Sequence, residues 1–368
     1  MIHYSCIGAT GYVCGEVLRM MVNHHEGELV NVLDTYGVGD AISTHHPALR
    51  GFYDQVIMDL TEENVRETAK KSDVIMIQVP SGDVAKWAEI VLAEDCAIID
   101  IGADIRFRDV DVWEKWYGQK HPDAKMTHDA VYCIPEVMRD LAKGKKLIAN
   151  PGCYPTASTL GLQPMLKAGH IVDNTIVIDA KSGYTGAGRR PALNKLLTEA
   201  ENNFCAYALG GGHRHTPEIE QNIAYITGKD LMKPETWQYI NFQPHLLPQV
   251  RGIEVTIYAT CDRDFTNEEV YELYKDFYKN EPFVKVFPAS LPVQTKWVYG
   301  TNFCEMTPTF DARTHRLIVS SVIDNIGKGA AGQAIQNMNL IMGLPETTGL
   351  MMPPDVSVIF GSTSFDPI

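Results

Sequence analysis

The fold is decided near the N-terminus by Tyr4-Ser5-Cys6-Ile7-Gly8-Ala9-Thr10-Gly11-Tyr12-Val13-Cys14-Gly15. Its apolar start predicts a strand over residues 4–7, and the glycines that follow predict a tight turn into a helix. Glycines at such a turn let a pyrophosphate approach the backbone beside a helix N-terminus. The spacing is G-x-x-G, with Cys14 where a third glycine is usual. The stretch therefore predicts either a dinucleotide-binding turn or a tight turn without a ligand.

Strand and helix signals alternate over the first 150 residues. Strands are expected at 4–7, 29–33, 73–79 and 97–101, and helices at 15–22 and 84–92. This order predicts a mostly parallel sheet that is covered by helices on both faces. From about residue 175 the pattern changes to longer strands of α+β style, expected at 175–180, 249–260 and 317–322.

Asp34 lies at the end of the second expected strand, 26 residues after Gly8. An acid at this position can bind a ribose 2′-hydroxyl and would repel a 2′-phosphate, which favours NAD. The alternative is a solvated aspartate in a turn.

Composition limits the class of protein. With 368 residues, 45% hydrophobic and 21% charged, the chain is expected to form a soluble globular protein of two domains. The net charge of -14 argues against nucleic acid or an anionic membrane as partners, although a local cationic pocket would still accept an anionic substrate. No long apolar run or signal peptide is recognised, and the eight cysteines are scattered, so a reduced cytoplasmic protein is expected.

A second strand-turn-helix stretch contains a cysteine. It reads Leu147-Ile148-Ala149-Asn150-Pro151-Gly152-Cys153-Tyr154-Pro155-Thr156. Pro151 and Gly152 break the strand, and the apolar pattern from Ala157 suits a helix. Cys153 would then lie near a helix start, where free N–H groups and the helix dipole favour a thiolate nucleophile. The alternative is a small buried cysteine, and the turn alone does not decide between them.

Three further segments carry charge or histidine. Residues 180–190 close a strand with a glycine-rich, cationic loop that suits phosphate, or form a plain surface loop. His213 and His215 follow three glycines just before a helix, with Thr216 as its expected cap and Pro217 in its first turn. Histidine is the natural general base near neutral pH, whereas a metal site lacks a third ligand pattern. Residues 324–334 open a helix with small residues that permit close packing.

Taken together, these segments resemble the N-acetyl-γ-glutamyl-phosphate reductase family, within the aspartate-semialdehyde dehydrogenase superfamily. The matching strings follow the family order and span nearly the whole chain: 8–12, 99–106, 149–156, 181–189, 213–219, 244–253 and 322–332. The strings N-P-G-C-Y-P-T and H-R-H-x-P-E-I are the most specific. Departures from the family pattern are Cys14, Ser81, Gln249-Val250 and Asp34.

The resemblance implies a reaction and its residues. The family reduces N-acetyl-γ-glutamyl phosphate to N-acetylglutamate semialdehyde and phosphate with NADPH, in arginine biosynthesis. Cys153 would form the thioester and His215 would be the acid/base group, with His213 beside it. The implied substrate ligands are Lys181, Arg251, Glu218 and Asn150. The implied dinucleotide ligands are Gly8, Thr10, Gly11, Tyr12, Val13, Asp34, Pro80, Ser81, Gly186, Gly188, Asn325, Lys328 and Gly329. The family favours NADP, and Asp34 keeps NAD possible.

The resemblance also implies the architecture. A Rossmann-like domain is expected over 1–150, completed by about 325–368 and including a helix from about 328 to 343. An α+β catalytic and oligomerisation domain is expected over 151–324, with dimers or tetramers. Two other functions stay open: a related reductase of the α-aminoadipate lysine route, often acting on a carrier protein, and a non-catalytic nucleotide-sensing protein. Aspartate-semialdehyde dehydrogenase fits the H-R-H-x-P-E-I string poorly.

Overall fold

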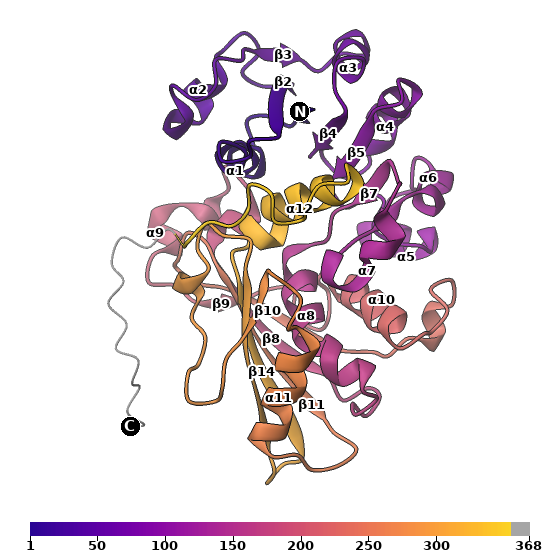
Figure 1. Ribbon diagram of the computed structural model, residues 1–368, viewed down its shortest axis with the longest axis vertical. Coiled ribbons are helices and arrows are strands. Elements are labelled where there is room, and N and C mark those ends of the chain that lie inside the picture. The colour runs from indigo at the N-terminus through magenta and orange to yellow at the C-terminus, as the bar shows by residue number, and fades with distance from the viewer. Residues whose placement is uncertain (355–368) are drawn as a thin grey trace. The chain divides into compact units, whose positions relative to one another are not determined.

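The computed structural model describes residues 1–354, which divide into two compact units (Figure 1). Unit 1 comprises Met1–Pro151 and Ala330–Met351. Unit 2 comprises Gly152–Gly329, with the short stretch from Met352 assigned to it as well. The expected completion of the first domain extended to residue 368, and its last part, residues 355–368, lies outside the described residues.

Unit 1 is built on a parallel sheet in the order β3-β2-β1-β4-β5-β7-β6. Its strands are β1 (Ile2–Ile7), β2 (Gly27–Asp34), β3 (Ile57–Asp59), β4 (Val74–Ile77), β5 (Ala97–Asp100), β6 (Val131–Tyr132) and β7 (Leu147–Ala149). β1 lies between β2 and β4, so the strand order reverses at β1. Ligands of such sheets bind outside the carboxyl ends of the strands at this reversal.

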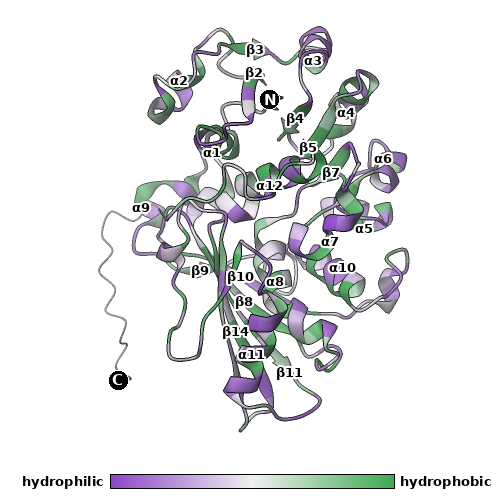
Figure 2. Cartoon of the chain, in the orientation of Figure 1, coloured by the Kyte–Doolittle hydropathy of each residue, from purple (hydrophilic) through white to green (hydrophobic). Residues whose placement is uncertain are grey.

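Apolar runs explain why the central strands form. Every residue of β4 and β5 is buried, as expected for parallel strands with helices on both faces, and Figure 2 shows hydrophobic residues concentrated in β4, β5 and β7. The predicted α/β architecture of this part of the chain is therefore confirmed.

Helices cover both faces of this sheet, because right-handed crossovers to the left and to the right of β1 place them on opposite sides. The main helices are α1 (Tyr12–Met21), α3 (Glu62–Ala69), α4 (Val84–Ala93), α5 (Val110–Tyr117), α6 (Ala124–Asp129), α7 (Pro135–Ala142) and α12 (Gly332–Ile341). α3 packs on α4, whereas α12 packs on both α1 and α7.

α12 is an unusual buried helix, because many of its inward side chains are amides. Gln333, Gln336, Asn337 and Asn339 are all fully buried. The Asn337 amide donates to the carbonyl of Cys133 at 3.0 Å and to Asn150 Oδ1 at 3.1 Å. These bonds offset the cost of burying the amides and tie the late segment of the chain to the end of β7.

The helix predicted over about 328–343 is shorter than expected. A π-helical turn covers Gly327–Ala331, and regular α12 begins only at Gly332. The reason is local: the N–H of Gly329 bonds back to the Asp324 carbonyl at 2.9 Å, and the N–H of Lys328 bonds to the Thr301 carbonyl.

Unit 2 contains a mixed sheet in the order β12-β13-β14-β11-β8-β10-β9. Its strands are β8 (Val177–Ser182), β9 (Cys205–Ala206), β10 (Asn241–Leu246), β11 (Ile253–Thr260), β12 (Val284–Val286), β13 (Cys304–Asp311) and β14 (Arg316–Ile323). Pairs β8–β10 and β12–β13 are parallel, and the other pairs are antiparallel. The predicted α+β character of this part is confirmed.

The two faces of this sheet differ. Burial alternates along β11, and helix α8 (Cys153–Lys167) packs on β11 and β14. Helix α11 (Asn267–Phe277) packs on β13, and α10 (Thr216–Ile226) packs on α8. We call the side that faces α8 the helix face, and the other side the open face. Partly exposed polar residues such as Asp179 and Glu254 lie on the open face.

The strand predicted over 249–260 begins later, at Ile253. Residues 249–252 form a turn, in which the carbonyls of Gln249 and Val250 accept from the N–H groups of Tyr184 and Thr185. Gly252 has a φ of +103°, which ends the turn and which other residues rarely adopt.

Helix α8 is buried on nearly all sides, so it lacks an amphipathic period. Every residue from Tyr154 to Leu166 is buried. A methyl group added to Gly161 would lie 2.6 Å from Ile257 Cδ1, so glycine lets the helix approach β11 closely. This close contact fixes where the first residue of α8, Cys153, lies in unit 2.

The remaining helical segments are short and lie in loops. They are α2 (Ile42–His45), α9 (Leu197–Ala200) and single turns at Pro47–Leu49, Tyr184–Ala187, Leu193–Lys195, Pro234–Thr236 and Thr295–Trp297. None of the helices in residues 1–354 is long and apolar enough to cross a membrane.

Candidate active site

Cys153 is the first residue of α8, whereas the sequence predicted only that it lies near a helix start. Gly152 is the N-cap, with extended backbone and no side-chain cap bond to the first turn. Cys153 is partly exposed, whereas the residues that follow it in the helix are buried. A cysteine at this position has the helix N-terminus and its dipole to stabilise a thiolate. The alternative of a fully buried, inert cysteine does not fit this exposure.

Glu218 holds the turn that carries Cys153. Its side chain, on α10, is fully buried, and Oε1 accepts from the N–H of Gly152 at 2.8 Å. The resemblance implied that Glu218 binds substrate, but the structure turns this oxygen to the backbone beside Cys153. We therefore assign Glu218 a positioning role.

Aromatic and histidine rings form a cluster beside the cysteine. Tyr154, next in sequence, makes edge contacts with His213 and His215 at ring-centre distances of 5.7 and 5.9 Å. The two histidine rings lie 4.8 Å apart, and the Tyr207 hydroxyl is 3.4 Å from that of Tyr154. The structure thus brings together three residues that the sequence predicted: Cys153, His213 and His215.

Burial and charge set the ionisation of this cluster. Burial, followed by the neighbouring Tyr207, raises the pKa of Tyr154, and the nearby Cys153 thiol adds to the shift. Burial likewise raises the pKa of Tyr207 to about 12, again with a contribution from Cys153. Both phenols therefore stay protonated at neutral pH and can donate hydrogen bonds.

His213 is fixed as one neutral tautomer. Its Nδ1 accepts from the backbone N–H of His215 at 3.0 Å, so the proton is on Nε2, which lies 3.5 Å from the Tyr207 hydroxyl. Burial, with help from the Arg214 charge, lowers the pKa of His213 to about 4. At neutral pH this ring is therefore the neutral imidazole, with a proton on Nε2 only, and not an imidazolium acid.

The lowered pKa predicts a loss of stability in acid. Below about pH 6.5 the unfolded chain protonates this histidine, whereas the folded protein holds it neutral to about pH 4. Between pH 7 and 5 we expect His213 to cost about 1 to 2 kcal/mol of unfolding free energy. Urea unfolding of the wild type and His213→Gln at both pH values measures this cost, because glutamine does not titrate. Equal losses in the two proteins would contradict the prediction.

The start of α10 differs from the prediction that Thr216 caps it. His215 is the N-cap residue, without a side-chain cap bond, and Thr216 is already helical. The Thr216 hydroxyl donates to the Gly211 carbonyl at 3.4 Å instead. Pro217 lies in the first turn, as predicted.

Gly329 lies directly against the cysteine. A methyl group on this residue would be 2.7 Å from Cys153 Cβ and 3.2 Å from its Cα. This close contact lies within unit 2, and it depends on the absence of a side chain at position 329.

Arg251 and Asn325 are joined to the same end of the unit 2 sheet. The Arg251 Nε donates to Asp324 Oδ2 at 2.6 Å, which fixes the orientation of the guanidinium. Asn325 accepts from the N–H of Gly252 at 2.7 Å and donates to the Thr185 hydroxyl at 2.9 Å. These contacts order the loop after β8.

The glycines of that loop differ in their surroundings. A methyl group on Gly186 would lie 3.2 Å from Ser182 Oγ and 3.5 Å from Asn325 Nδ2. Gly188 is exposed, has a φ of +74° and has nothing near its missing side chain. Gly186 thus has a packing reason, and Gly188 a backbone reason, for being glycine.

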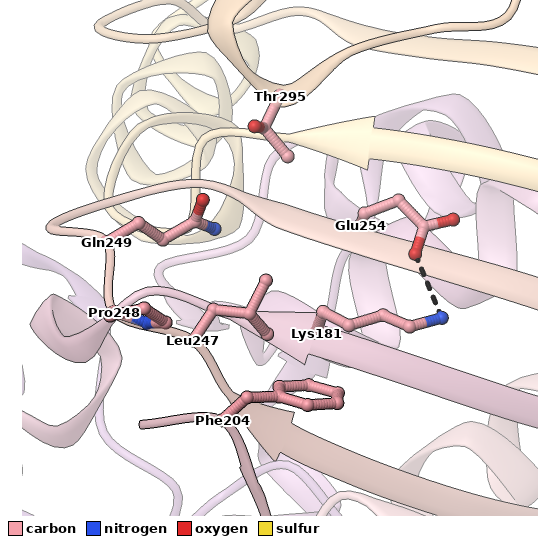
Figure 3. Close-up of a pocket in the computed structure, with 7 residues that line it drawn as sticks. All are labelled: Lys181, Phe204, Leu247, Pro248, Gln249, Glu254 and Thr295. Carbon is pink, nitrogen blue, oxygen red and sulfur yellow. Dashed lines mark ion pairs between the residues drawn. The ribbon is translucent and has the colours of Figure 1, made fainter. Parts of the chain in front are cut away.

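Lys181 lies on the other face of the sheet from the cysteine cluster. Its neighbour Ser182 shares the helix face with Ile253, whereas Lys181 pairs with Glu254 on the open face. The Lys181 ammonium is 3.1 Å from Asp179. It also forms an ion pair with Glu254 at 3.2 Å (Figure 3). The resemblance implied a substrate ligand, but strand alternation turns this side chain away from Cys153.

An open pocket of about 500 Å³ lies around Lys181. Its lining residues are Lys181, Phe204, Leu247, Pro248, Gln249, Glu254 and Thr295 (Figure 3). His245 stacks on Phe204 and contacts Asp179 at 3.1 Å, so the charged groups here are paired among themselves.

Lys328 also differs from the role that the resemblance implied. Its side chain is fully buried, and its ammonium lies 5.6 Å from the ring centre of Phe283. The Lys328 side chain therefore lies in the interior of unit 2, against the Phe283 ring.

In unit 1, the glycine turn has the shape that a dinucleotide requires. Gly8 has a φ of +89°, and a methyl group on it would overlap the carbonyl oxygen of Gln78, which follows β4. Gly11 is the N-cap of α1 and makes no side-chain cap bond. Tyr12 and Val13 begin the helix, three residues earlier than predicted.

Asp34 is bound to the glycine turn. Its Oδ2 accepts from both the N–H and the hydroxyl of Thr10, each at 2.8 Å. Its Oδ1 accepts from the N–H groups of Thr35 at 2.7 Å and Tyr36 at 3.3 Å. It is therefore more than the solvated turn aspartate that the sequence left open.

Three other predicted residues lie at the carboxyl edge of the unit 1 sheet. Pro80 and Ser81 follow β4, and the Ser81 carbonyl accepts from Gln119 at 3.2 Å. Asn150, after β7, is fully buried, and its amide donates to the Ala330 carbonyl at 3.0 Å. Asn150 was implied as a substrate ligand, but its bonds give it a positioning role before Cys153.

Sequence reasoning missed Tyr207 and Asp324 as members of the site. Tyr207 has no local motif, and only the pairing of β9 with β10 reveals its place. Asp324 is fully buried and accepts from the N–H groups of Gly300, Ile326 and Gly327, besides Arg251. Asp324 is the first residue of the string D-N-x-G-K-G at 324–329, and this motif could have identified it. Among residues 1–354, no cluster of three or more potential metal ligands occurs.

Comparison with known proteins places this geometry in a family. Residues 5–145 match the family model described as semialdehyde dehydrogenase, NAD binding domain, and 153–325 match the semialdehyde dehydrogenase, dimerisation domain. Among solved structures, aspartate semialdehyde dehydrogenase II from Vibrio cholerae, complexed with ASA, has a TM-score of 0.69 at 16% identity. That match covers 93% of this chain and 98% of the other. It shows a shared fold.

Curated relatives are much closer in sequence. An N-acetyl-gamma-glutamyl-phosphate reductase from Desulforudis audaxviator is 44% identical over 353 residues, covering 96% of this chain and 99% of that protein. The protein of the same name from Moorella thermoacetica is 41% identical with the same coverage. With Cys153 at the start of α8 and two histidines beside it, this chain belongs to the N-acetyl-gamma-glutamyl-phosphate reductases of the semialdehyde dehydrogenase family.

Proposed function

We propose that this protein reduces N-acetyl-γ-glutamyl phosphate to N-acetylglutamate semialdehyde and phosphate, as a step of arginine biosynthesis. The observation that carries the proposal is the partly exposed Cys153 at the N-terminus of α8, beside the His213–His215 pair. The names of relatives that match over nearly the full length support the same reaction.

The residues of unit 1 fit a nicotinamide dinucleotide. A Cβ atom on Gly8 would overlap the carbonyl oxygen of Gln78, so only glycine fits here. The turn at this point therefore consists of backbone alone. Tyr12 and Val13 would hold the pyrophosphate through their backbone N–H groups at the start of α1. Gly8, Thr10 and Gly11 would shape the turn, because their own N–H groups donate to Leu33, Asp34 and Gly8. Pro80 and Ser81 would lie beside it. A reduced nicotinamide, when bound, supplies the hydride that converts a thioester to the aldehyde.

Cys153 starts the reaction. Its thiolate attacks the acyl carbon, a carbon–sulfur bond forms, and the bond to the phosphate oxygen breaks with its electron pair leaving on phosphate. The helix N-terminus stabilises the thiolate before this step and again when reduction releases the sulfur from the product.

His215 is the proposed acid/base group. His213 is held as a neutral tautomer by the His215 backbone and lies beside the Tyr207 hydroxyl, so it positions the pair. His215 then holds or delivers the proton at the carbonyl oxygen of the reacting acyl group. Glu218 keeps the turn of Cys153 in place through the Gly152 N–H.

Anion binding in unit 2 falls to a smaller set of residues than the resemblance implied. Arg251, oriented by Asp324, is the proposed ligand of the substrate carboxylate or phosphate. The backbone around Gly186 and Gly188, with Asn325 and Gly329, is proposed to line the nicotinamide and phosphate. Lys181 and the Lys328 side chain are engaged elsewhere, as described above.

The reverse reaction tests the function. With N-acetylglutamate semialdehyde and inorganic phosphate, we expect the enzyme to reduce NAD or NADP, followed at 340 nm. Omitting phosphate should abolish the signal, because phosphate must release the acyl group from Cys153. Aspartate semialdehyde is the control substrate and should react at least about tenfold more slowly.

Other outcomes of this assay separate the alternatives. A requirement for a carrier-bound aminoadipate semialdehyde would replace the proposed substrate with that of the lysine route. Dinucleotide binding without reaction of any semialdehyde would indicate a nucleotide-sensing protein. The net charge of -14 already disfavours an acidic carrier protein.

Assembly and location are further parts of the proposal. The open face of the unit 2 sheet and the match of 153–325 to a dimerisation domain support a homo-oligomer, a dimer or a tetramer. A small-molecule substrate and a cytoplasmic location follow from the proposed biosynthetic reaction.

A further inference from the structure

We propose that Asp34 makes the dinucleotide site selective for a ribose with a free 2′-hydroxyl, so that NAD is preferred over NADP. The inference rests on the proposed function, because it presupposes a dinucleotide site in unit 1. It departs from the NADP preference that the family resemblance implied.

The place of Asp34 in the sheet is the first argument. It is the last residue of β2, which pairs with β1, and the glycine turn follows β1. In doubly wound sheets an acid at this strand end lies at the adenosine ribose when the pyrophosphate occupies the glycine turn. A 2′-phosphate would therefore bring its charge close to this carboxylate.

The second argument is that the carboxylate cannot turn away. Four donors hold it: the N–H and hydroxyl of Thr10, and the N–H groups of Thr35 and Tyr36. These bonds account for the roughly four lone-pair sites of a carboxylate. Asp34 thus acts through its fixed negative charge and through the shape that it gives the glycine turn, rather than by swinging onto the ribose.

The third argument is the lack of compensating cations in the neighbouring sequence. Between Arg19 and Arg50 the chain has no Lys or Arg. Recognition of a 2′-phosphate ordinarily uses an Arg or Lys near this strand end.

The histidines of this region are engaged in other contacts. His45 pairs with Asp40 at 2.9 Å, and its ring meets Tyr36 edge-on. The His46 Nε2 donates to the Ala9 carbonyl at 2.8 Å, and its ring lies where a side chain on Gly15 would be. They support the turn and its loop from within the protein.

The expected size follows from Coulomb's law. A phosphate carries a charge of about -1.5 to -2 at neutral pH, and repulsion by one fixed carboxylate near a protein surface should disfavour it at least about tenfold. We therefore expect the Kd for NADP⁺ to exceed that for NAD⁺ by at least about tenfold.

Isothermal titration of the full-length protein with NAD⁺ and NADP⁺ tests the inference without relying on turnover. Asp34→Asn keeps a side-chain oxygen of the same length to accept from Thr10 but removes the charge, and Asp34→Ser removes the charge and shortens the side chain. Each should reduce the ratio of the two Kd values to about threefold or less, mainly by tighter NADP⁺ binding. Asp40→Asn, which removes a charge from the same loop, is the matched control and should leave the ratio unchanged.

The outcomes are distinct. Wild-type protein that binds NADP⁺ as tightly as NAD⁺, or a ratio that Asp34→Asn leaves unchanged, would overturn the role of Asp34 while keeping the proposed function. Failure of the wild type to bind either dinucleotide would overturn the proposed function itself. Circular dichroism of both Asp34 variants shows whether a reduced ratio of the two Kd values results from unfolding. If the Ser variant is unfolded, the result of the Asn variant alone tests the inference.

Discussion

Replacing Cys153 with serine is expected to lower kcat by on the order of a thousandfold or more. A serine hydroxyl stays protonated at a helix N-terminus where a thiol can ionise, so the attacking atom is lost. Dinucleotide affinity, set in unit 1, should stay within about twofold of the wild type. Steady-state kinetics in the semialdehyde assay and isothermal titration measure the two quantities.

Cys205→Ser is the matched control for this substitution. Cys205 is also a partly exposed cysteine of unit 2, in strand β9. Its variant should retain activity within about threefold and fold normally. Turnover of Cys153→Ser at a tenth of the wild-type rate or above would remove Cys153 as the nucleophile.

Gly329→Ala should have the second largest effect, about a hundredfold loss of kcat. The new methyl group would lie 2.7 Å from Cys153 Cβ, so either the cysteine or the turn that carries Gly329 must move. A displacement of even 1 Å at a nucleophile is costly because the reacting atoms must meet at a defined distance. The rate of iodoacetamide labelling at Cys153 should change in parallel, which a distant structural effect would not cause.

Gly212→Ala provides the comparison for this clash. A methyl group there would meet only the Leu209 and Ala208 carbonyls, at 3.6 and 3.8 Å, which is ordinary contact. We expect its kcat to stay within about threefold of the wild type. If Gly329→Ala behaves like Gly212→Ala, the close packing against Cys153 has no catalytic importance.

Local sequence was sufficient for the two strand-turn-helix elements. Gly8 and Gly11 predicted the first turn, and Pro151 and Gly152 predicted that Cys153 lies near a helix start. Both turns could be predicted because their conformation depends on the backbone freedom of a few adjacent residues. The alternation of strands and helices likewise predicted both sheets. These features follow from short-range sterics and periodicity.

Side-chain direction was harder to predict. Lys181 and Ser182 are neighbours on β8, yet they point to opposite faces, and only the position of α8 shows which face carries the cysteine. Tyr207 enters the cluster through the pairing of β9 with β10, which no local pattern reports. Strand register and helix packing, rather than residue type, decide these positions.

Three polar residues that were expected to bind ligands form hydrogen bonds with backbone groups of the protein itself. Glu218, Asn150 and Asp34 all accept or donate bonds to backbone groups of the turns. A buried carboxylate or amide has the same sequence signature whether its partner is a ligand or a peptide group. Residue type alone therefore does not distinguish a ligand-binding role from a role in holding a turn.

Because α12 belongs to unit 1, the two units differ in when they can be completed during synthesis. All of Gly152–Gly329 leaves the ribosome before α12, so the second unit has its full sheet while the first still lacks a helix that packs on α1 and α7. Until that helix arrives, the nascent first unit exposes the surface of α1 and α7 that the helix will cover. The first unit is therefore complete only after residues near 350 have been synthesised, although its synthesis begins at residue 1.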